Sequence, residues 1–422
     1  MALTAKAKRA LAGIFLFFYL PVCYHFGWFL QKGILFDFPS FYYAAQIAFS
    51  WGGSPYGVYK FHAASAILGR KVHPYLYPPP SLIAFWPLSF FSIEQAQAAF
   101  LVVSHLCYLG SIWLIVTRLT PLPENRRARE ITVGFCLIYM LVFDPALTTF
   151  AQGQVNMIVL FFICLALTAL RREHASWRVA LPLSIAILLK TYPVLLLAPV
   201  LFRRRFRAAG FTCFFFACFT GVSVLALRKS VWMDWVREIL PIGGYADNAR
   251  AAAFLWNQSL NAFITRLLVP SEFNQAPLVY PALAKTAVSV CAALLLGATL
   301  FLAFRVSQRP RDRSSGDDEI SAFLLLTFLI APLSWDHHLV YILPCATLAI
   351  SLIVNGEVAG KMVPAVLVAA LFAIAWKLPI YEPGLRQGWW VLFISVKFYA
   401  VAALWVFYMD RLWRRLRPMI WR

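Results

Sequence analysis

The sequence contains few charged residues, and acidic residues are the scarcest of them. Of 422 residues, 13% are charged, with 18 Asp and Glu against 38 Lys and Arg, while 61% are hydrophobic. A soluble domain is about a quarter charged and roughly half apolar. The mean hydropathy of +0.71 therefore indicates an all-α polytopic membrane protein. No stretch between the apolar runs is long enough for a separate soluble domain, so we expect residues 1–422 to form a single integral membrane domain.

Several common motifs are also missing. The sequence has neither a Walker phosphate-binding loop nor the glycine fingerprint of a dinucleotide-binding fold. Its eight cysteines lie inside or at the edge of apolar runs, and none has the spacing of a zinc site or a redox pair. We see no internal repeat, which counts against a secondary transporter. We therefore expect no cofactor and no metal.

The net charge of +20 is divided among short clusters between the apolar runs. A nucleic-acid site would more often form one continuous basic face, so no nucleic-acid partner is expected. Short Arg-rich loops beside membrane spans follow the positive-inside rule and attract anionic lipid headgroups. The clusters lie at 126–129, 171–178, 203–207, 305–313 and 411–422.

The apolar runs predict about twelve transmembrane helices. Two runs are ambiguous, because 79–117 is divided near residue 92 and 179–202 is interrupted at 190–193. Reading the first as one crossing and the second as a pair of short helices places every Arg cluster and both termini in the cytoplasm. The first run is too long and bulky for a cleaved signal peptide. The runs lie near 8–30, 79–117, 130–145, 155–170, 179–202, 209–227, 280–304, 320–333, 339–355, 361–377 and 388–409.

The loops without Arg clusters then lie outside the cytoplasmic (inner) membrane, and they carry nearly all the unusual polar residues. The largest are 31–78 and 228–279. The prolines and aromatics of 31–78 predict a structured first external loop with a helix around 38–50, its aromatics in the headgroup zone. We therefore expect the working face to be external.

Asp37 is the most informative residue of this face. It follows an apolar run long enough to cross a bilayer, so it should emerge at the far lipid–water boundary. A carboxylate there is poorly placed for stability and well placed for chemistry on a lipid-borne substrate. Asp followed two residues later by Pro is also a common helix opening, so Asp37 could simply cap a helix.

Further polar motifs occur at the ends of apolar runs. Gln154 and Asn156 open a predicted span, where amides suit sugar hydroxyls or a phosphate but also cap helices. Lys190 is the only cation inside 179–202. A charge inside the membrane points to function, although a lysine can also extend to the interface.

Two more polar segments come later in the chain. Asn257 and Arg266 belong to an amide-rich stretch of the second large loop, which could also be an ordinary hydrated loop. Trp335, His337 and His338 lie between two apolar runs. Adjacent histidines do not share a helix face, so a metal site built on this pair is not expected.

Transfer of a sugar from a lipid phosphate is a reaction that fits each of these groups. A carboxylate would deprotonate the acceptor hydroxyl, contributing about 10²–10⁴-fold. Cations would stabilise the charge that grows on the departing phosphate. Amides and tryptophan would hold the sugar. A membrane-anchored donor requires no nucleotide-binding loop.

The ordered set of motifs resembles glycosyltransferase family 87, the polyprenol-phosphate-mannose-dependent mannosyltransferases. It extends over about residues 30 to 340, most of the chain, and the set is more specific than any one motif. The matching segments are Asp37 with Tyr42, 52–56, 77–80, 153–156, 190–193, 257–259 and 334–338.

The resemblance implies the C-type glycosyltransferase fold, a helical membrane bundle with a large first external loop. It implies that Asp37 is the general base of an inverting transfer and that the donor is a polyprenyl-phosphate sugar, most readily mannose. We expect Lys190, His337, His338 and Arg266 to bind the donor phosphate. Tyr42, Tyr77, Gln154, Asn156, Asn257 and Trp335 are expected to contact the sugar or the glycolipid or glycan acceptor.

Two other classes of protein fit part of the pattern. A flippase or carrier for lipid-linked glycans would also use aromatics, amides and cations near a headgroup, but would need polar residues along a path to both faces. A glycan polymerase or ligase acting on a lipid diphosphate would need a larger late external loop and more external arginine. Arg237, Arg250 and Arg266 in 228–279 keep that alternative open.

Overall fold

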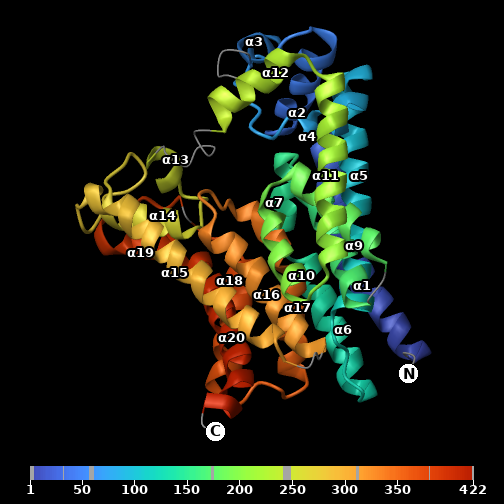
Figure 1. The fold of residues 1–422 in the computed structure, drawn as a ribbon, viewed down its shortest axis with the longest axis vertical. Coiled ribbons are helices and arrows are strands. Elements are labelled where there is room, and N and C mark those ends of the chain that lie inside the picture. Colours follow the sequence, from blue (N-terminus) through green and yellow to red (C-terminus); the bar gives the residue numbers. More distant parts are fainter. Residues whose placement is uncertain are drawn as a thin grey trace.

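The computed structural model describes residues 4–31, 33–56, 61–172, 175–240, 249–309, 313–379 and 381–420, and all its regular elements are helices (Figure 1). Within these residues, the β-type pairings are two isolated bridges, Asn257 with Trp335 and Ser271 with Asn274. The all-helical membrane fold predicted from composition is confirmed. The helices of the first half are α1 (Ala5–Gln31), α2 (Phe38–Ala45), α3 (His62–Leu68), α4 (Pro80–Phe85), α5 (Ile93–Leu114), α6 (Arg126–Leu141), α7 (Asp144–Gln152), α8 (Asn156–Arg171), α9 (Ser176–Leu189) and α10 (Leu197–Phe202).

The described part of the second half contains ten more α-helices. Several short 3-10 or π turns extend or precede helices, among them η1 (Gln46–Ser50), η3 (Trp86–Phe90), η4 (Ile115–Leu119), η5 (Tyr192–Leu196) and η8 (Asp336–Ile342). The helices are α11 (Phe206–Ala226), α12 (Lys229–Asp234), α13 (Ala249–Ala253), α14 (Leu260–Leu268), α15 (Pro281–Ser307), α16 (Arg313–Ile330), α17 (Leu343–Val354), α18 (Met362–Ala375), α19 (Val391–Ile394) and α20 (Val396–Ile420).

Six helices of the described chain are long and apolar enough to cross a membrane, or seven if the bent pair Gly388–Ile394 and Val396–Leu416 is one span. Five shorter apolar helices, of 10–17 residues, accompany them. The expected total of about twelve spans thus stays a prediction. Both runs are divided where the sequence indicated, because η3 ends before α5 begins and Lys190 lies between α9 and η5.

Helix α8 is at the centre of the bundle. It contacts α5 and α9, and most of its side chains are buried, including Leu160 and Cys164 at 0% exposure. In contrast, α15 exposes apolar residues such as Leu294 and Phe301 along most of its length. An apolar exposed face of this kind is typical of a helix that faces lipid.

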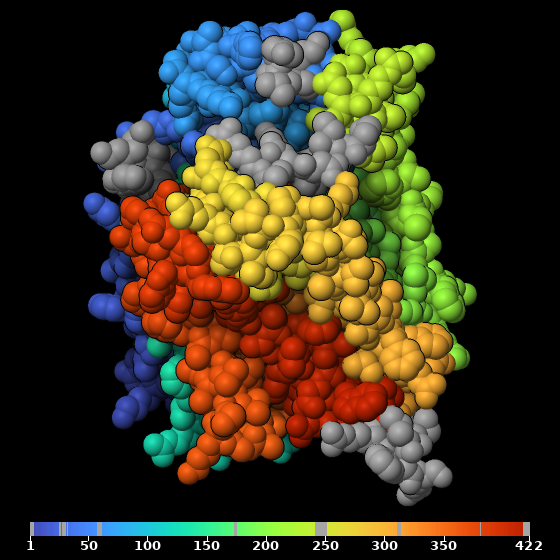
Figure 2. Space-filling view, turned by 90° about the vertical axis from the view of Figure 1, so that its left-hand side faces the viewer, coloured from blue at the N-terminus to red at the C-terminus, as the bar shows by residue number. Residues whose placement is uncertain are grey.

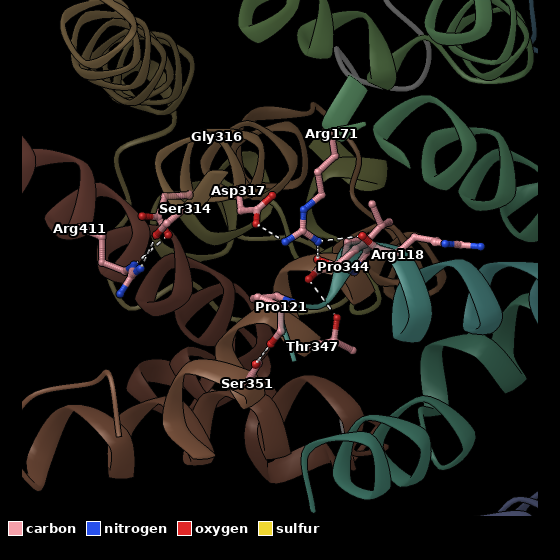
Figure 3. A network of polar contacts seen from close by, with 12 residues as sticks. Arg118, Pro121, Arg171, Ser314, Gly316, Asp317, Pro344, Thr347, Ser351 and Arg411 are labelled. Carbon is pink, nitrogen blue, oxygen red and sulfur yellow. Dashed lines mark hydrogen bonds and ion pairs between the residues drawn. The ribbon is translucent and has the colours of Figure 1, made fainter. Parts of the chain in front are cut away.

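Arginines from separate clusters meet at one end of the molecule, which we call the basic end, around the acidic run 317–319. Arg171 lies 2.9 Å from Asp317, and it also donates to the carbonyl of Arg118 (Figure 3). Arg411 and Arg415 bind Asp318 at 2.8 and 3.0 Å. Both labelled chain ends lie towards this end of the bundle in Figure 1. The grouping agrees with the predicted shared side for the Arg clusters.

The segment predicted to be the first external loop lies at the opposite end, with α2, α3, α4 and α12 at the top of Figure 1. The helix predicted around 38–50 is present as α2 and η1. The aromatics of this helix were expected in the headgroup zone, but those of α2 are buried in protein, where Phe38 and Phe41 pack against Phe100 of α5. On the face shown in Figure 2, residues 249–279 in yellow lie between this loop in blue and the C-terminal helices in orange and red.

Candidate active site

Asp37 occupies the N-cap position of α2 but does not use its side chain as a cap. Its Oδ2 instead accepts a hydrogen bond of 2.7 Å from Nε2 of Gln154, and its backbone N–H donates to the carbonyl of Gln152 at 2.7 Å. Capping was the structural alternative for this carboxylate. The observed contact instead joins the first loop to the turn between α7 and α8.

Gly153 makes this close contact possible. It lies between Gln152 and Gln154 with φ +71°, a left-handed conformation that favours glycine. A Cβ at this position would lie 2.9 Å from Cβ of Phe38 and 3.0 Å from Cδ1 of Leu35. The absence of a side chain therefore lets the α7–α8 turn approach the Asp37 segment.

Gln154 also connects Asp37 to the predicted cations. The hydroxyl of Tyr77 donates to Oε1 of Gln154 at 3.0 Å, and Nζ of Lys190 lies 5.2 Å from the centre of the Tyr77 ring. Nζ of Lys190 is also 3.0 Å from Nε2 of His338. Five of the predicted residues therefore converge on one site, although they come from five separate segments of the chain.

Burial raises the pKa of the Asp37 carboxyl. The hydrogen bond from Gln154 opposes this shift because it stabilises the charged form. The charged groups that act on Asp37 are all basic, namely His73, Lys190 and Arg70. Within the described residues, Oδ1 of Asp37 accepts no hydrogen bond, so it is available to a substrate hydroxyl. A desolvated carboxylate with a raised pKa and one free oxygen is suited to proton abstraction.

His338 is held in place by the packing of η8. A charged Lys190 can only donate, so Nε2 of His338 accepts and its proton is on Nδ1. The carbonyl of His337 accepts hydrogen bonds from Nδ2 of Asn156 and the hydroxyl of Thr149, both at 3.1 Å. The hydroxyl of Tyr341 donates to Oδ1 of Asn156 at 2.6 Å. Asn156 thus uses both polar atoms to fix the histidine segment.

The ring atoms of the two histidines remain largely unpaired. Nδ1 of His338 and both ring nitrogens of His337 are buried and have no hydrogen-bond partner among the described residues. Buried polar atoms are usually paired, so these nitrogens are candidates for substrate contacts. A small cavity beside His338, lined also by Tyr192, Thr327 and Ser334, has room for about one water molecule.

The remaining predicted residues lie away from Asp37. Asn257 is fully buried, and its Oδ1 accepts from the N–H of Ser334 at 2.9 Å while its Nδ2 donates to the carbonyl of Ala252 at 3.1 Å. Trp335 forms the bridge with Asn257 and packs against Phe254. Their predicted roles in sugar binding remain untested, and in the structure they fix the segment before His337.

Arg266 and Tyr42 are likewise engaged with protein groups. Arg266 is 1% exposed, and its guanidinium donates to the carbonyl of Asn257 at 2.8 Å and to Oγ of Ser395 at 2.8 Å. The Tyr42 hydroxyl donates to the carbonyl of Phe91 at 2.8 Å. Binding of the donor phosphate by Arg266 and of sugar by Tyr42 therefore stay predictions.

Sequence reasoning missed several residues of this region. Arg70 donates to the carbonyls of Ile34 and Leu35 just before Asp37, and His73 acts electrostatically on Asp37. Lys397 is buried at 2% exposure with Nζ 2.6 Å from Oδ1 of Asp336. It is the only cation within the apolar run 388–409. The rule that singled out Lys190, a lone charge in an apolar run, would have found it.

Known proteins with similar sequences match most of the chain. A sequence profile of glycosyltransferase family 87 matches residues 75–332, which is more than half of the 422 residues. A polyprenol-phosphate-mannose-dependent alpha-(1-2)-phosphatidylinositol mannoside mannosyltransferase of Mycobacterium tuberculosis is 25% identical over 290 residues. The match covers 66% of this chain and 62% of that protein.

A second relative from Mycobacterium tuberculosis has a longer match. It is a polyprenol-phosphate-mannose-dependent alpha-(1-2)-phosphatidylinositol pentamannoside mannosyltransferase, 24% identical over 355 residues, covering 82% of this chain and 75% of that protein. The pentamannoside enzyme of Mycolicibacterium smegmatis is 26% identical over 272 residues, covering 64% of this chain and 60% of its own length. The matched lengths include Gln154, Asn156 and Lys190, which lie inside the profile range.

Proposed function

The chain belongs to glycosyltransferase family 87, and on that premise we propose that it transfers mannose from a polyprenyl-phosphate donor to a hydroxyl of a lipid- or glycan-linked acceptor, with inversion at the anomeric carbon. The observation that carries the proposal is the joining of Asp37 to Lys190 and His338 through Gln154 and Tyr77. A base and a cationic group for the leaving phosphate thus share one site. The relatives' names supply the donor and the sugar.

Asp37 acts as the general base. Oδ1 accepts the proton of the acceptor hydroxyl while the hydroxyl oxygen bonds to the anomeric carbon of the sugar. The bond from that carbon to the phosphate oxygen breaks at the same time, and its electron pair stays on the phosphate. Because the acceptor attacks from the side opposite to the phosphate, the configuration at the anomeric carbon is inverted.

Lys190 and His338 act on the leaving phosphate. The phosphate gains negative charge as the glycosidic bond breaks, and a buried cation stabilises that charge more strongly than it would in water. Lys190 is 8% exposed and keeps its place through His338 and the Tyr77 ring. His338 can donate from Nδ1 to a phosphate oxygen.

The site is assigned to the outer face of the cytoplasmic membrane, in a bundle of about twelve spans. Support comes from the separation of the two ends, because Arg171 and Arg411 lie with the acidic run 317–319 and not with Asp37. The positive-inside rule places such an Arg-rich end in the cytoplasm. The proposed transfer of mannose requires no metal and no nucleotide.

The test is the Asp37→Asn variant, assayed with polyprenyl-phosphate-mannose and a phosphatidylinositol mannoside acceptor. Asn retains the size of Asp and its bond to Gln154 after an amide flip, but it lacks basicity, so we expect transfer to fall by at least about 10²-fold. Glu94→Gln, an exposed acidic residue at the start of α5, is the matched control and should transfer at the parent rate. Near-parent transfer by a folded Asp37→Asn protein would remove Asp37 as the base.

A further inference from the structure

Lys397 is a buried cation in a region without a recognised motif. It is the second residue of α20, lies beyond the profile match, and is 2% exposed. A buried charge is costly unless it is paired. Lys397 is paired with Asp336, whose side chain is 17% exposed, and Asp144 at the start of α7 also acts electrostatically on Lys397. The pair therefore joins three helical elements: α20, η8 and α7.

The position of Asp336 gives this pair its significance. Asp336 is the first residue of η8, directly before His337 and His338. Its backbone N–H donates to the carbonyl of Trp256 at 3.1 Å, and the N–H of His338 donates to the carbonyl of Trp335 at 2.8 Å. A shift of the Asp336 carboxylate would therefore move the turn that carries His338.

The residues before Lys397 are also held in place. Nε2 of Gln258 donates to the carbonyl of Ile394 at 2.8 Å, and Arg266 donates to Oγ of Ser395. The N–H of Gln258 donates to the carbonyl of Ser334 at 2.8 Å. Gln258 therefore bonds both to the α19–α20 junction and to the segment before η8, and Arg266 bonds to the junction as well. These contacts fix the backbone position of Lys397 relative to Asp336.

We propose that Lys397 is a positioning residue of the transfer site: through Asp336 it fixes η8 so that His338 stays within hydrogen-bond distance of Lys190 and both face the donor phosphate. The inference rests on the proposed function, because it concerns the donor of that reaction. Lys397 itself touches neither the substrate nor Asp37. Its effect reaches the reaction only through the geometry of His338.

The test compares Lys397→Met with the parent in purified, lipid-reconstituted protein. Misplacement of a positioned group by about 1 Å can cost up to about 10²-fold, so we expect kcat/KM for polyprenyl-phosphate-mannose to fall by about 10–100-fold. Inhibition by polyprenyl phosphate, the donor without its sugar, should weaken in parallel because it needs the same phosphate contacts. The KM for the acceptor should change little. Lys397→Arg keeps the ion pair and should retain most of the donor affinity.

Two further variants separate positioning from folding. Lys397→Met could be unstable because it leaves Asp336 unpaired. The double variant Asp336→Asn with Lys397→Met removes both charges, so it should fold. It should show the same loss of donor affinity. Asp318→Asn breaks a buried ion pair at the basic end. It should lower thermal stability without changing inhibition by polyprenyl phosphate.

A double-mutant cycle with His338→Asn identifies the route of the effect. If Lys397 acts through His338, adding Lys397→Met to His338→Asn should cause little further loss of kcat/KM. Equal losses in both backgrounds, or an unchanged donor KM in folded Lys397→Met, would overturn the inference while the parent still transfers mannose. A parent that transfers no mannose from polyprenyl-phosphate-mannose would instead overturn the proposed function, and the inference with it.

Discussion

The carboxylates of Asp37, Asp144 and Asp336 lie near the histidine segment or the first loop, and their partners differ. Asp336 is neutralised by Lys397 at 2.6 Å, and Asp144 opens α7 next to Pro145 and within electrostatic reach of Lys397. A carboxylate held in an ion pair is a weaker base because the cation favours its charged form. Within the described part of the chain, the side chain of Asp37 has only the amide of Gln154 as a hydrogen-bond partner. Among these residues it is the one equipped to take a proton.

The bond from Gln154 should be visible in the pH dependence of transfer. The base must be deprotonated, so kcat/KM should rise with pH through the pKa of Asp37, which burial places above the usual range. Gln154 lowers this pKa by donating to the carboxylate, so Gln154→Ala should raise it. We expect the acid limb of kcat/KM to move to higher pH in this variant, because loss of the bond destabilises the charged carboxylate.

Tyr77→Phe is the matched control for this measurement. It removes the hydroxyl that donates to Gln154 but keeps the ring beside Lys190. Its acid limb should move less than that of Gln154→Ala, because the bond to Asp37 remains. An acid limb that stays in place in Gln154→Ala would mean that a group other than Asp37 controls the profile.

At the scale of helices, the apolar runs predicted most elements, including the interruption at Lys190. Helix α9 has 14 residues and is therefore about 21 Å long, shorter than the ~30 Å hydrocarbon layer. Lys190 therefore follows a helix that is too short to cross this layer alone. The interruption itself was predicted from a single cation between two short apolar runs.

The use of amides as braces could not be predicted from the sequence. Asn156 and Asn257 have the composition and position of sugar ligands, yet each is fully buried and bonded to backbone or tyrosine groups. An amide is equally able to bind a hydroxyl or a carbonyl. The choice depends on which backbone atoms the fold brings near, and that is set by packing between segments distant in the chain. The partner of Lys397 could not be predicted for the same reason, because Asp336 is 61 positions away in sequence.

The junction of α7 and α8 provides a test at this scale. In Gly153→Ala the new Cβ would lie 2.9 Å from Cβ of Phe38 in a backbone with φ +71°. A non-glycine residue in this backbone conformation costs about 1–3 kcal/mol. If the turn moves away from Phe38 to relieve the close contact, Gln154 moves away from Asp37. We expect a lower melting temperature and a loss of transfer greater than the loss of folded protein.

Gly221→Ala in α11 is the matched control. A Cβ there has no neighbour within 4 Å, and Ala is favoured over Gly inside a helix by about 1 kcal/mol. This variant should be as stable as the parent or more stable, with unchanged transfer. Parent-like activity in Gly153→Ala would show that the turn does not need this close contact.

At the scale of the whole molecule, the two ends of the bundle are chemically different. At the basic end, Arg171, Arg203 and Arg411 form ion pairs with the acidic run 317–319. The three arginines belong to three different helical regions. At the end that holds Asp37, one carboxylate oxygen and several histidine nitrogens have no hydrogen-bond partner among the residues that the structure describes. A lipid-linked glycan flippase needs a polar path to both faces, and a transferase needs reactive groups at only one. This asymmetry favours the transferase over the flippase.

The same asymmetry makes a prediction about orientation in the membrane. Arg-rich loops remain in the cytoplasm, so the basic end should be internal and the Asp37 end external. Lys71, near Asp37, and Arg127, in an Arg cluster, are both exposed in the structure. Each would be replaced singly by cysteine in a variant whose eight native cysteines are changed to serine or alanine. A membrane-impermeant thiol reagent applied to spheroplasts should label Lys71→Cys but not Arg127→Cys, and permeabilised membranes should show labelling of both. Labelling of Arg127→Cys alone in sealed spheroplasts would place the transfer site on the cytoplasmic side and require a donor presented from within the cell.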